Sequence, residues 1–526
     1  EIEPVRTIQR ALERAREFAS FDSSSVVYVS SDRGKDSNLG TKEIEPVRTI
    51  QRALERAREL PSPRTIVLET ARYELEETVS ITSQDENLTI TSLDPNSPAV
   101  VTGAKRLENL EWQAYNGTAA NAWRTRVENV NMYGLRVNGK RAVRSRFPNA
   151  DPERTLNPQG WISTPTDWMQ PEITSKTNPP TEYIVTDPRY TRSDSTGNEL
   201  QYQIGIGGSC QDVDPPAGYW CSAHPNRTVD GSLTHRSPAG ISNLNSKILP
   251  NFPYKNASRA VVHACRGGRN CWFTWMFDVV DSNSSALRFS GRGSQGAEGS
   301  DDGGVWYIEN VLEELDDANE FYYDGEFLYY VYNGTGSIPN DTIFESVERK
   351  ILFDVRGNQS VPVRNVRLDN IVITNSALTY LDPHGLPSGG DWGLNRDGAA
   401  VRVEGTDGFQ ITNCLMTLLD ASAVSINAYN RNLRIQENEM VSIGESAITS
   451  WGLTRRGEDV EDQFVGVAKD LPMGMGIDGT DGNQPRGNQI VSNLIHEIGI
   501  YQKQSSMYFQ GTFASLFKIL LLWTHI

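Results

Sequence analysis

A repeat of short strands in the C-terminal half places the strongest constraint on the fold of this 526-residue chain. Three alternating segments begin with apolar residues 23 and then 24 positions apart, namely Val401-Arg402-Val403, Val424-Ser425-Ile426 and Ile448-Thr449-Ser450. A second strand follows each of them and ends in an asparagine: Asn413, Asn438 and Asn493. A fixed period of this size indicates units that bury their apolar faces against their neighbours. Because the segments are too short to stand alone and have no helical period, we predict an all-β fold, a parallel β-helix.

Charge and hydropathy exclude two classes of partner. The net charge of −17 argues against nucleic acid and against anionic membrane surfaces, since both require a basic patch. A spanning helix needs about 20 apolar residues. The longest apolar run, Leu516 to Trp523, is far shorter and contains Lys518. We therefore expect no nucleic-acid partner, no membrane span and a monomeric protein.

Cysteines and glycosylation motifs favour an extracellular protein. Cys210 could pair with Cys221, and Cys265 with Cys271, and either disulfide would imply an oxidising compartment. Cys414 follows a repeat asparagine and is expected to be an unpaired core residue. Eight N-x-S/T motifs permit secretion: Asn87, Asn116, Asn226, Asn256, Asn283, Asn333, Asn340 and Asn358. The chain starts at Glu1 without a methionine or a signal peptide, so we expect a missing or processed N-terminus and a secreted glycoprotein.

The N-terminal region contains a duplication. Residues 1–17 recur unchanged at 43–59. In the second copy an apolar stripe at helical spacing predicts an amphipathic helix, made by Ile50, Ala53, Leu54 and Ala57. This helix would cover the open end of the first coil. The first copy lacks the strands that flank the second, so we expect residues 1–20 to lie outside the core.

The remaining chain divides by the presence of the coil period. Residues 21–104 are predicted to form the N-terminal cap and first coils, and residues 356–510 the main coils. The period is lost over 105–355, which we interpret as a β-rich insertion or wrap-around subdomain with hairpins at Asn138-Gly139 and Asp324-Gly325. Residues 511–526 form either an aberrant tail or a covering segment.

Three blocks resemble a known group of proteins. They are VVYVSSDRGKDSNLGTKEIEPVRTIQRAL (26–54), LRVNGKRAVRSRFPNADPE (135–153) and GGVWYIENVLEELDDANEFYYD (303–324). These blocks resemble right-handed parallel β-helix repeat proteins of pectin-lyase-like fold, and the chain is most similar to glycoside hydrolase family 141, over about residues 21–510. The resemblance implies a right-handed solenoid that acts on plant or microbial glycans, with family carboxylates on later coils.

The repeat also predicts where a ligand lies. Alternation turns Val401, Val403, Val424, Ile426 and Ile448 inward. The outward stack then contains Arg402, Glu404, Ser425, Asn427, Thr449 and Trp451, continued by Asp478, Tyr508 and Gln510. The turns before these strands carry carboxylates at Asp397, Asp420 and Glu445. Glycoside hydrolysis needs two carboxyl groups about 5–9.5 Å apart, which adjacent coils could supply. We therefore predict Asp397, Asp420 and Glu445 as catalytic groups, and as substrate-binding groups Arg402, Glu404, Asn427, Trp451, Asp478 and Tyr508.

Each of these residues also has a structural explanation. Turn carboxylates commonly satisfy turn backbone, and Asn413, Asn438 and Asn493 are expected to form a buried asparagine ladder. Trp451 is either a sugar platform or a packing residue under the 453–474 insertion. The segment GIDGTDGN around Asp478 suggests Ca²⁺ only weakly, because it lacks a bidentate glutamate at fixed spacing. We predict no metal site and no cofactor.

Two classes of function remain open. The first is a secreted enzyme acting on a polysaccharide, a glycoside hydrolase, with a lyase or epimerase as the enzymatic alternative. An acidic groove argues against the polyanionic substrates of a lyase. The second class is a non-catalytic glycan-binding or surface-structural β-helix, which would bind oligosaccharide without forming product.

Overall fold

Strands dominate the chain. The computed structural model describes residues 23–117, 119–154, 160–162, 240–266, 273–289, 305–380, 398–451 and 482–510, with short strands at 167–169, 184–185, 192–193, 199–200, 202–203, 228–229, 232–233 and 516–520. Within these ranges α2 (Ile50–Arg58) is the only α-helix. The described part is therefore mostly β-structure with several parallel sheets, as the repeat predicted. The first copy of the duplicated segment, residues 1–17, lies outside the described residues.

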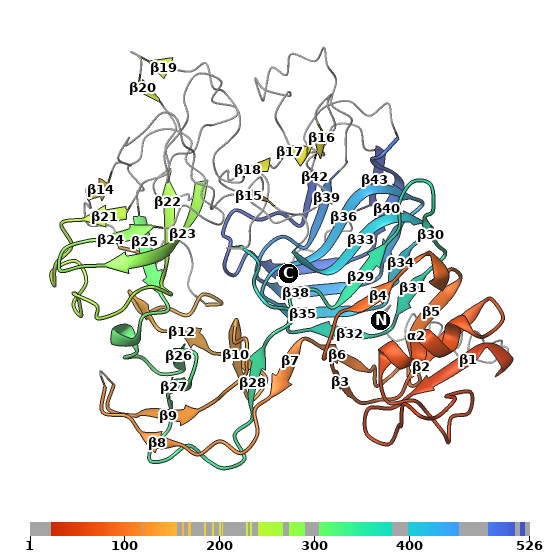
Figure 1. Cartoon of the computed structure of the whole chain (residues 1–526), viewed down its shortest axis with the longest axis horizontal. Coiled ribbons are helices and arrows are strands. Elements are labelled where there is room, and N and C mark those ends of the chain that lie inside the picture. The colour runs from red at the N-terminus through yellow and green to blue at the C-terminus, as the bar shows by residue number, and fades with distance from the viewer. Residues whose placement is uncertain are drawn as a thin grey trace, which may run out of the picture.

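Strands of successive repeats pair in parallel and form three stacks, which we call columns (Figure 1). The first column contains β4 (Val79–Ile81), β29 (Phe353–Arg356), β33 (Ala399–Asp407), β36 (Ser422–Arg431), β39 (Ile448–Trp451) and β42 (Tyr508–Gln510). The second contains β1 (Val26–Val29), β2 (Arg64–Leu68), β5 (Leu88–Ser92), β31 (Arg367–Asp369), β34 (Gln410–Thr412), β37 (Arg434–Gln436), β40 (Pro485–Val491) and β43 (Leu516–Leu520). The third contains β3 (Arg72–Glu74), β6 (Val100–Thr102), β32 (Val372–Thr374), β35 (Leu415–Leu419), β38 (Glu439–Ile443) and β41 (Leu494–Ile498). From β4 to β41 each repeat contributes one strand to each column.

A long segment interrupts the repeats between β6 and β29. The repeat before it stacks directly on the repeat after it, because β4 pairs with β29, β5 with β31 and β6 with β32. The intervening residues, here called the inserted region, form mostly antiparallel sheets (Figure 1). Its main strands are β7 (Ala104–Arg106), β9 (Ala122–Arg126), β10 (Gly134–Val137), β11 (Lys140–Arg141), β12 (Val143–Arg144), β13 (Arg146–Phe147), β22 (Val261–Arg266), β23 (Phe273–Ser282), β25 (Val305–Glu309), β26 (Glu320–Tyr323), β27 (Phe327–Val331) and β28 (Phe344–Val347).

Both predicted hairpins are present in the inserted region. Asn138 and Gly139 connect β10 to β11 with φ values of 49° and 75°, which is the left-handed geometry that an Asn-Gly turn provides. Asp324 and Gly325 connect β26 to β27.

The core of the columns is formed by the predicted inward residues. Val401, Val403, Val424, Ile426 and Ile448 are all fully buried in one apolar cluster, which draws on residues 27–101 and 352–490. Burial of each such side chain contributes about 1.5–3 kcal/mol. Separate apolar clusters fill the inserted region. The alternation that defined the repeat is therefore confirmed at these positions.

Helix α2 packs on the β1 end of this core. Its predicted stripe is buried, and Thr49 caps its N-terminus by accepting a hydrogen bond from the Arg52 backbone N–H at 3.1 Å. Asp36 in turn accepts hydrogen bonds from the Thr49 N–H at 2.9 Å and from its hydroxyl at 3.1 Å. The helix thus joins the core cluster beside β1 and β2, where the sequence predicted a cap.

The predicted asparagine ladder is shorter than expected. Asn438 Nδ2 donates to Asn493 Oδ1 at 2.9 Å, so these two residues stack. Asn438 Oδ1 accepts from the backbone N–H of Cys414, not from Asn413. Asn413 lies one position earlier, has a φ of 55°, and donates to Asp369 Oδ1 at 2.8 Å. Cys414 is a free, buried thiol, as predicted.

Candidate functional site

The first column carries two rows of polar side chains on the face opposite the apolar core. Strand register places Asp354, Arg402, Ser425 and Thr449 in one row, and Arg356, Glu404, Asn427 and Trp451 in the next. The stacking order matches the prediction. However, the sequence predicted an open face, whereas Arg402, Asn427 and Trp451 are 6%, 0% and 2% exposed.

Contacts along these rows fix several side chains. The Arg402 guanidinium binds Asp354 through both carboxylate oxygens, at 2.9 and 2.7 Å. The Trp451 ring lies 5.1 Å from the Phe509 ring. The hydroxyls of Ser425 and Thr449 are buried and meet no hydrogen-bond partner within the part of the chain that the structure describes. Buried polar atoms of this kind are uncommon and call for an explanation.

The register of the last described repeat differs from the prediction. Tyr508 was expected in the outward stack, but it pairs with Ile448 and packs against the apolar core. Phe509 pairs with Thr449 and takes the outward position instead. Asp397 and Asp478 lie outside the described residues.

The remaining predicted carboxylates lie on what we call the corner turns, which lead from the third column to the first and whose described residues are 375–380, 398, 420–421, 444–447 and 499–507. Asp420 is the first residue of one corner turn, and Glu445 is the second residue of the next. Both are buried, at 0% and 1% exposure. The Ser422 hydroxyl donates to Glu445 Oε2 at 3.1 Å.

Asp420 is held by two arginines from the inserted region. Arg136 Nη2 and Arg141 Nε both donate to Asp420 Oδ1 at 2.8 Å, and both arginine side chains are almost fully buried. Burial raises the pKa of Asp420, but the two guanidinium groups outweigh it and hold the pKa below its ordinary value. The hairpin can approach Asp420 this closely because Gly134 has no side chain. A Cβ at that position would lie 2.9 Å from Asp420 Oδ2.

The network continues from Asp420 into a second buried carboxylate. Tyr501, on the last described corner turn, lies beneath the guanidinium groups of Arg141 and Arg144, which are 5.8 and 5.7 Å from its ring centroid. Arg144 Nη1 then lies 3.4 Å from Glu309 Oε1. The corner turns and the inserted region thus share one chain of charged and aromatic groups.

Glu309 is the centre of the second half of this network. Its Oε1 accepts a hydrogen bond from the Tyr380 hydroxyl at 2.9 Å and lies 3.1 Å from His263 Nε2. Burial opposes ionisation, but His263 and Arg144 lower the pKa of Glu309 to about 2. Burial lowers the pKa of His263. The His263 and Tyr307 rings stack 4.5 Å apart.

These electrostatics limit the chemistry of the network. Asp420 and Glu309 remain ionised at neutral pH, so neither can donate a proton as a general acid. They can orient the surrounding arginines and tyrosines. Among the residues of the described ranges, no group of three His, Cys, Asp or Glu side chains is arranged to hold a metal ion.

Sequence reasoning missed the arginines of this site. Arg136, Arg141, Arg144 and Arg146 lie in the block 135–153, for which the sequence predicted a hairpin at Asn138-Gly139 and no site residue. The clustering of these arginines was the available signal. Arginines that are buried together need anionic partners, so the cluster could have indicated buried carboxylates nearby.

Comparison with known proteins gives a likeness of fold. A solved structure named "Glycoside hydrolase" matches 91% of this chain and 74% of its own, with a TM-score of 0.57 and 16% identity. A second, named "The complex structure of XylC with xylose", covers 92% of this chain and 56% of its own at 10% identity, and its TM-score of 0.37 is too low to support an argument. No family model and no curated protein matches the sequence. No helix of the described part is long and apolar enough to cross a bilayer. From its likeness to the first of these solved structures, the chain has a glycoside-hydrolase-like fold.

Proposed function

We propose that this protein is a carbohydrate-active enzyme, a glycoside hydrolase that acts on a polysaccharide along the first column. The observation that carries the proposal is the fold likeness to a solved glycoside hydrolase over 91% of the chain. We further propose that the three columns form a right-handed parallel β-helix and that the protein acts outside the cell. The disulfide-bonded state of Cys265 supports an oxidising compartment.

The first column provides groups that suit a sugar chain. Ser425 and Thr449 present buried hydroxyls without protein partners in the described ranges, and sugar hydroxyls could both donate to them and accept from them. Arg402, Glu404, Asn427 and Trp451 remain the proposed binding groups. Phe509 replaces Tyr508 in this set, because it occupies the outward position of its strand.

We assign proton transfer to Glu445 and Asp397 and a positioning role to Asp420. Asp420 is saturated at Oδ1 by two arginines, whereas Glu445 Oε2 accepts a hydrogen bond from a neutral hydroxyl. In the sequence Asp397 precedes β33 and Glu445 precedes β39, with the corner turn of Asp420 between them. Two strand spacings of about 4.8 Å favour the separation of about 6.5–9.5 Å used for inversion over the separation of about 5–5.5 Å used for retention.

The test is product analysis. The chain is incubated with neutral and acidic polysaccharides, and products are weighed by mass spectrometry. Fragments that have gained water are expected. Glu445→Gln and Asp397→Asn should each reduce turnover by about 10²- to 10⁴-fold, the range for general acid–base groups. Glu439→Gln, an exposed carboxylate on the same repeat as Glu445, is the matched control and should retain activity. Binding without product would refute the hydrolase and support a glycan-binding protein.

A lyase is the second candidate, and Lys503 is the observation that favours it. This half-buried corner-turn residue has its Nζ 3.3 Å from the Pro152 carbonyl oxygen, and burial lowers its pKa to about 8. A lysine of this kind can supply a neutral base near neutral pH. Unsaturated fragments without added water, abolished by Lys503→Met, would identify this reaction.

A further inference from the structure

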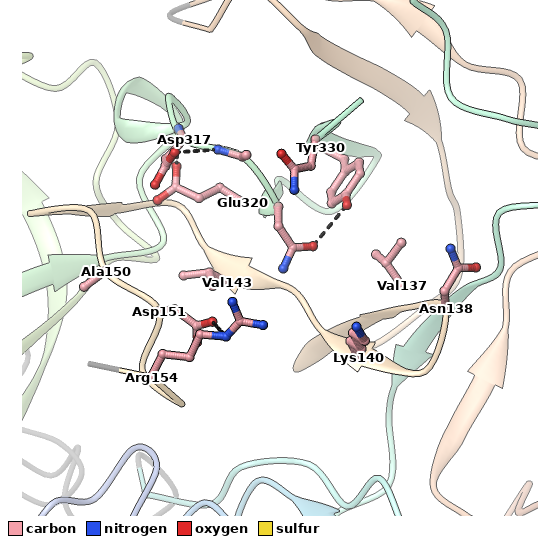
Figure 2. Close-up of a pocket in the computed structure, with 13 residues that line it drawn as sticks. Val137, Asn138, Lys140, Val143, Ala150, Asp151, Arg154, Asp317, Glu320 and Tyr330 are labelled. Carbon is pink, nitrogen blue, oxygen red and sulfur yellow. Dashed lines mark hydrogen bonds and ion pairs between the residues drawn. The ribbon is translucent and has the colours of Figure 1, made fainter. Parts of the chain in front are cut away.

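A pocket of about 400 Å³ lies within the inserted region, and the hydrolase proposal makes no use of it. The β10–β11 hairpin, the segment 150–154 and the turn before β26 contribute its walls. In the close-up Lys140, Asp151 and Arg154 lie along one side of the pocket, and Glu320 and Tyr330 along the other (Figure 2). The volume is at the small end of the range of about 300–1,000 Å³ typical of ligand sites.

The polar groups of this pocket are held in fixed positions. The Tyr330 hydroxyl donates to Asn319 Oδ1 at 3.0 Å, while Asn319 Nδ2 donates to the Arg141 carbonyl oxygen at 3.1 Å. The segment 150–154 is tied to the third column, because Glu153 pairs with Arg141 and accepts a hydrogen bond from the Ser442 hydroxyl at 2.9 Å. The pocket walls are thus anchored to the stacked repeats.

The charges that line the pocket balance. Lys140 and Arg154 are opposed by Asp151 and Asp317, and Arg154 lies 3.4 Å from Asp151. Glu320 is buried, and its two carboxylate oxygens accept hydrogen bonds from the backbone N–H groups of Arg146, Asp316 and Asp317. Burial raises the pKa of Glu320 to about 8, and these N–H groups oppose the shift. A balanced lining favours a neutral ligand over an anionic or cationic one.

We propose that this pocket is an accessory binding site for one or two units of a neutral sugar. The Asn319 amide, the carboxyl groups and the Tyr330 hydroxyl can together donate to and accept from sugar hydroxyls. The size of the pocket excludes a long polysaccharide but admits its end or a short branch. The site does not depend on hydrolysis and is formed by the inserted region alone.

Calorimetry with the full chain tests the proposal. The probes are the neutral disaccharides cellobiose, maltose and xylobiose, with galacturonic acid and glucosamine as charged comparisons. The double variant Lys140→Ala/Asp317→Ala removes two exposed lining groups without changing the net charge. It should weaken binding of a neutral disaccharide at least tenfold. The matched control Lys105→Ala/Glu108→Ala, an exposed pair elsewhere in the inserted region, should bind like the wild type.

Three results would overturn the accessory site. The first is the absence of millimolar binding for every neutral disaccharide, and the second is a preference for a charged sugar. The third is neutral-sugar binding that survives the Lys140→Ala/Asp317→Ala change, since the ligand would then occupy another surface such as the first column. Glu445→Gln separates this proposal from the hydrolase: it should reduce turnover about 10²- to 10⁴-fold and leave the pocket's affinity unchanged.

Discussion

Replacing Asp420 by asparagine tests whether its ion pairs fasten the inserted region to the repeats. The carboxylate is 0% exposed and lies between Arg136 and Arg141, whose side chains are 1% and 2% exposed. Arg141 keeps Glu153 as a partner after the change, whereas the other contacts of Arg136 are neutral: Asn375 Oδ1 and the carbonyl oxygens of Leu418 and Leu135. Removing one partner of a buried pair and leaving its charge uncompensated costs about 3–5 kcal/mol.

Hydrogen exchange measures this cost locally, which matters because a chain of this size need not unfold in one step. Backbone amides of β10 and β11 should exchange about 10²- to 10⁴-fold faster in Asp420→Asn, since each 1.36 kcal/mol corresponds to a factor of ten. Amides of β33 and β36 should change much less. The control is Glu326→Gln, which breaks an exposed pair with Arg126 and should cost no more than about 1 kcal/mol.

The pH dependence provides a second readout of the same interaction. The pKa of Asp420 is lowered in the folded protein, so its contribution is present above the ordinary value of 3.8 and is lost as pH falls through the lower folded value. Wild-type β10 protection should therefore fall at acid pH, and the variant should lack that component. An increase in exchange of less than tenfold in Asp420→Asn at neutral pH would refute the fastening role.

Two further predictions concern buried polar groups. The pKa of Glu309 is lowered from 4.5 to about 2 in the folded protein, so its ionisation contributes up to about 3 kcal/mol of stability above pH 4.5. This contribution is lost as pH falls toward 2. Urea unfolding of wild type and Glu309→Gln between pH 2 and 7 should show the difference, and parallel pH profiles would contradict it. Asn438→Ala removes hydrogen bonds to Asn493 and to the Ile411 carbonyl oxygen and leaves the Cys414 N–H without its acceptor, which should cost about 1–3 kcal/mol in urea unfolding. Its control is Arg434→Ala, an exposed residue on the same repeat, and equal stability of the two variants would count against the ladder.

The inward positions were predictable because they depend only on a local period. Val401, Val424 and Ile448 recur at nearly constant spacing, and strand alternation then assigns their faces. The same reasoning failed at Tyr508, which is separated from Ile448 by sixty positions and by long connections. Alternation defines two faces but not which is inner, so the phase is lost across an interruption. Here Phe509 contacts Trp451, and Tyr508 instead points toward the core.

The asparagines illustrate a second limit of sequence reasoning. Asn413 and Asn438 look equivalent because each follows a short strand of the second column. Their backbones differ, since Asn413 itself has a φ of 55° whereas in the next repeat Glu437 takes that position with a φ of 57°. Asparagine adopts the left-handed region more readily than other non-glycine residues. An asparagine at this point of a repeat can therefore either take the left-handed backbone position, as Asn413 does, or stack its side chain in the ladder, as Asn438 does. Only the register decides between them.

The chemistry of Asp420 could not be predicted because its partners lie far away in the chain. The sequence correctly assigned it to a turn before a first-column strand, but Arg136 is 284 positions distant. Two buried guanidinium groups convert a potential proton donor into an anchor that stays ionised at neutral pH. The same contact gives Arg136 and Arg141 a reason to be buried, and brings the inserted region against the corner turn that carries Asp420. The carboxylate held by two arginines is thus poorly suited to proton transfer, which is why we propose Glu445 and Asp397 for that role instead.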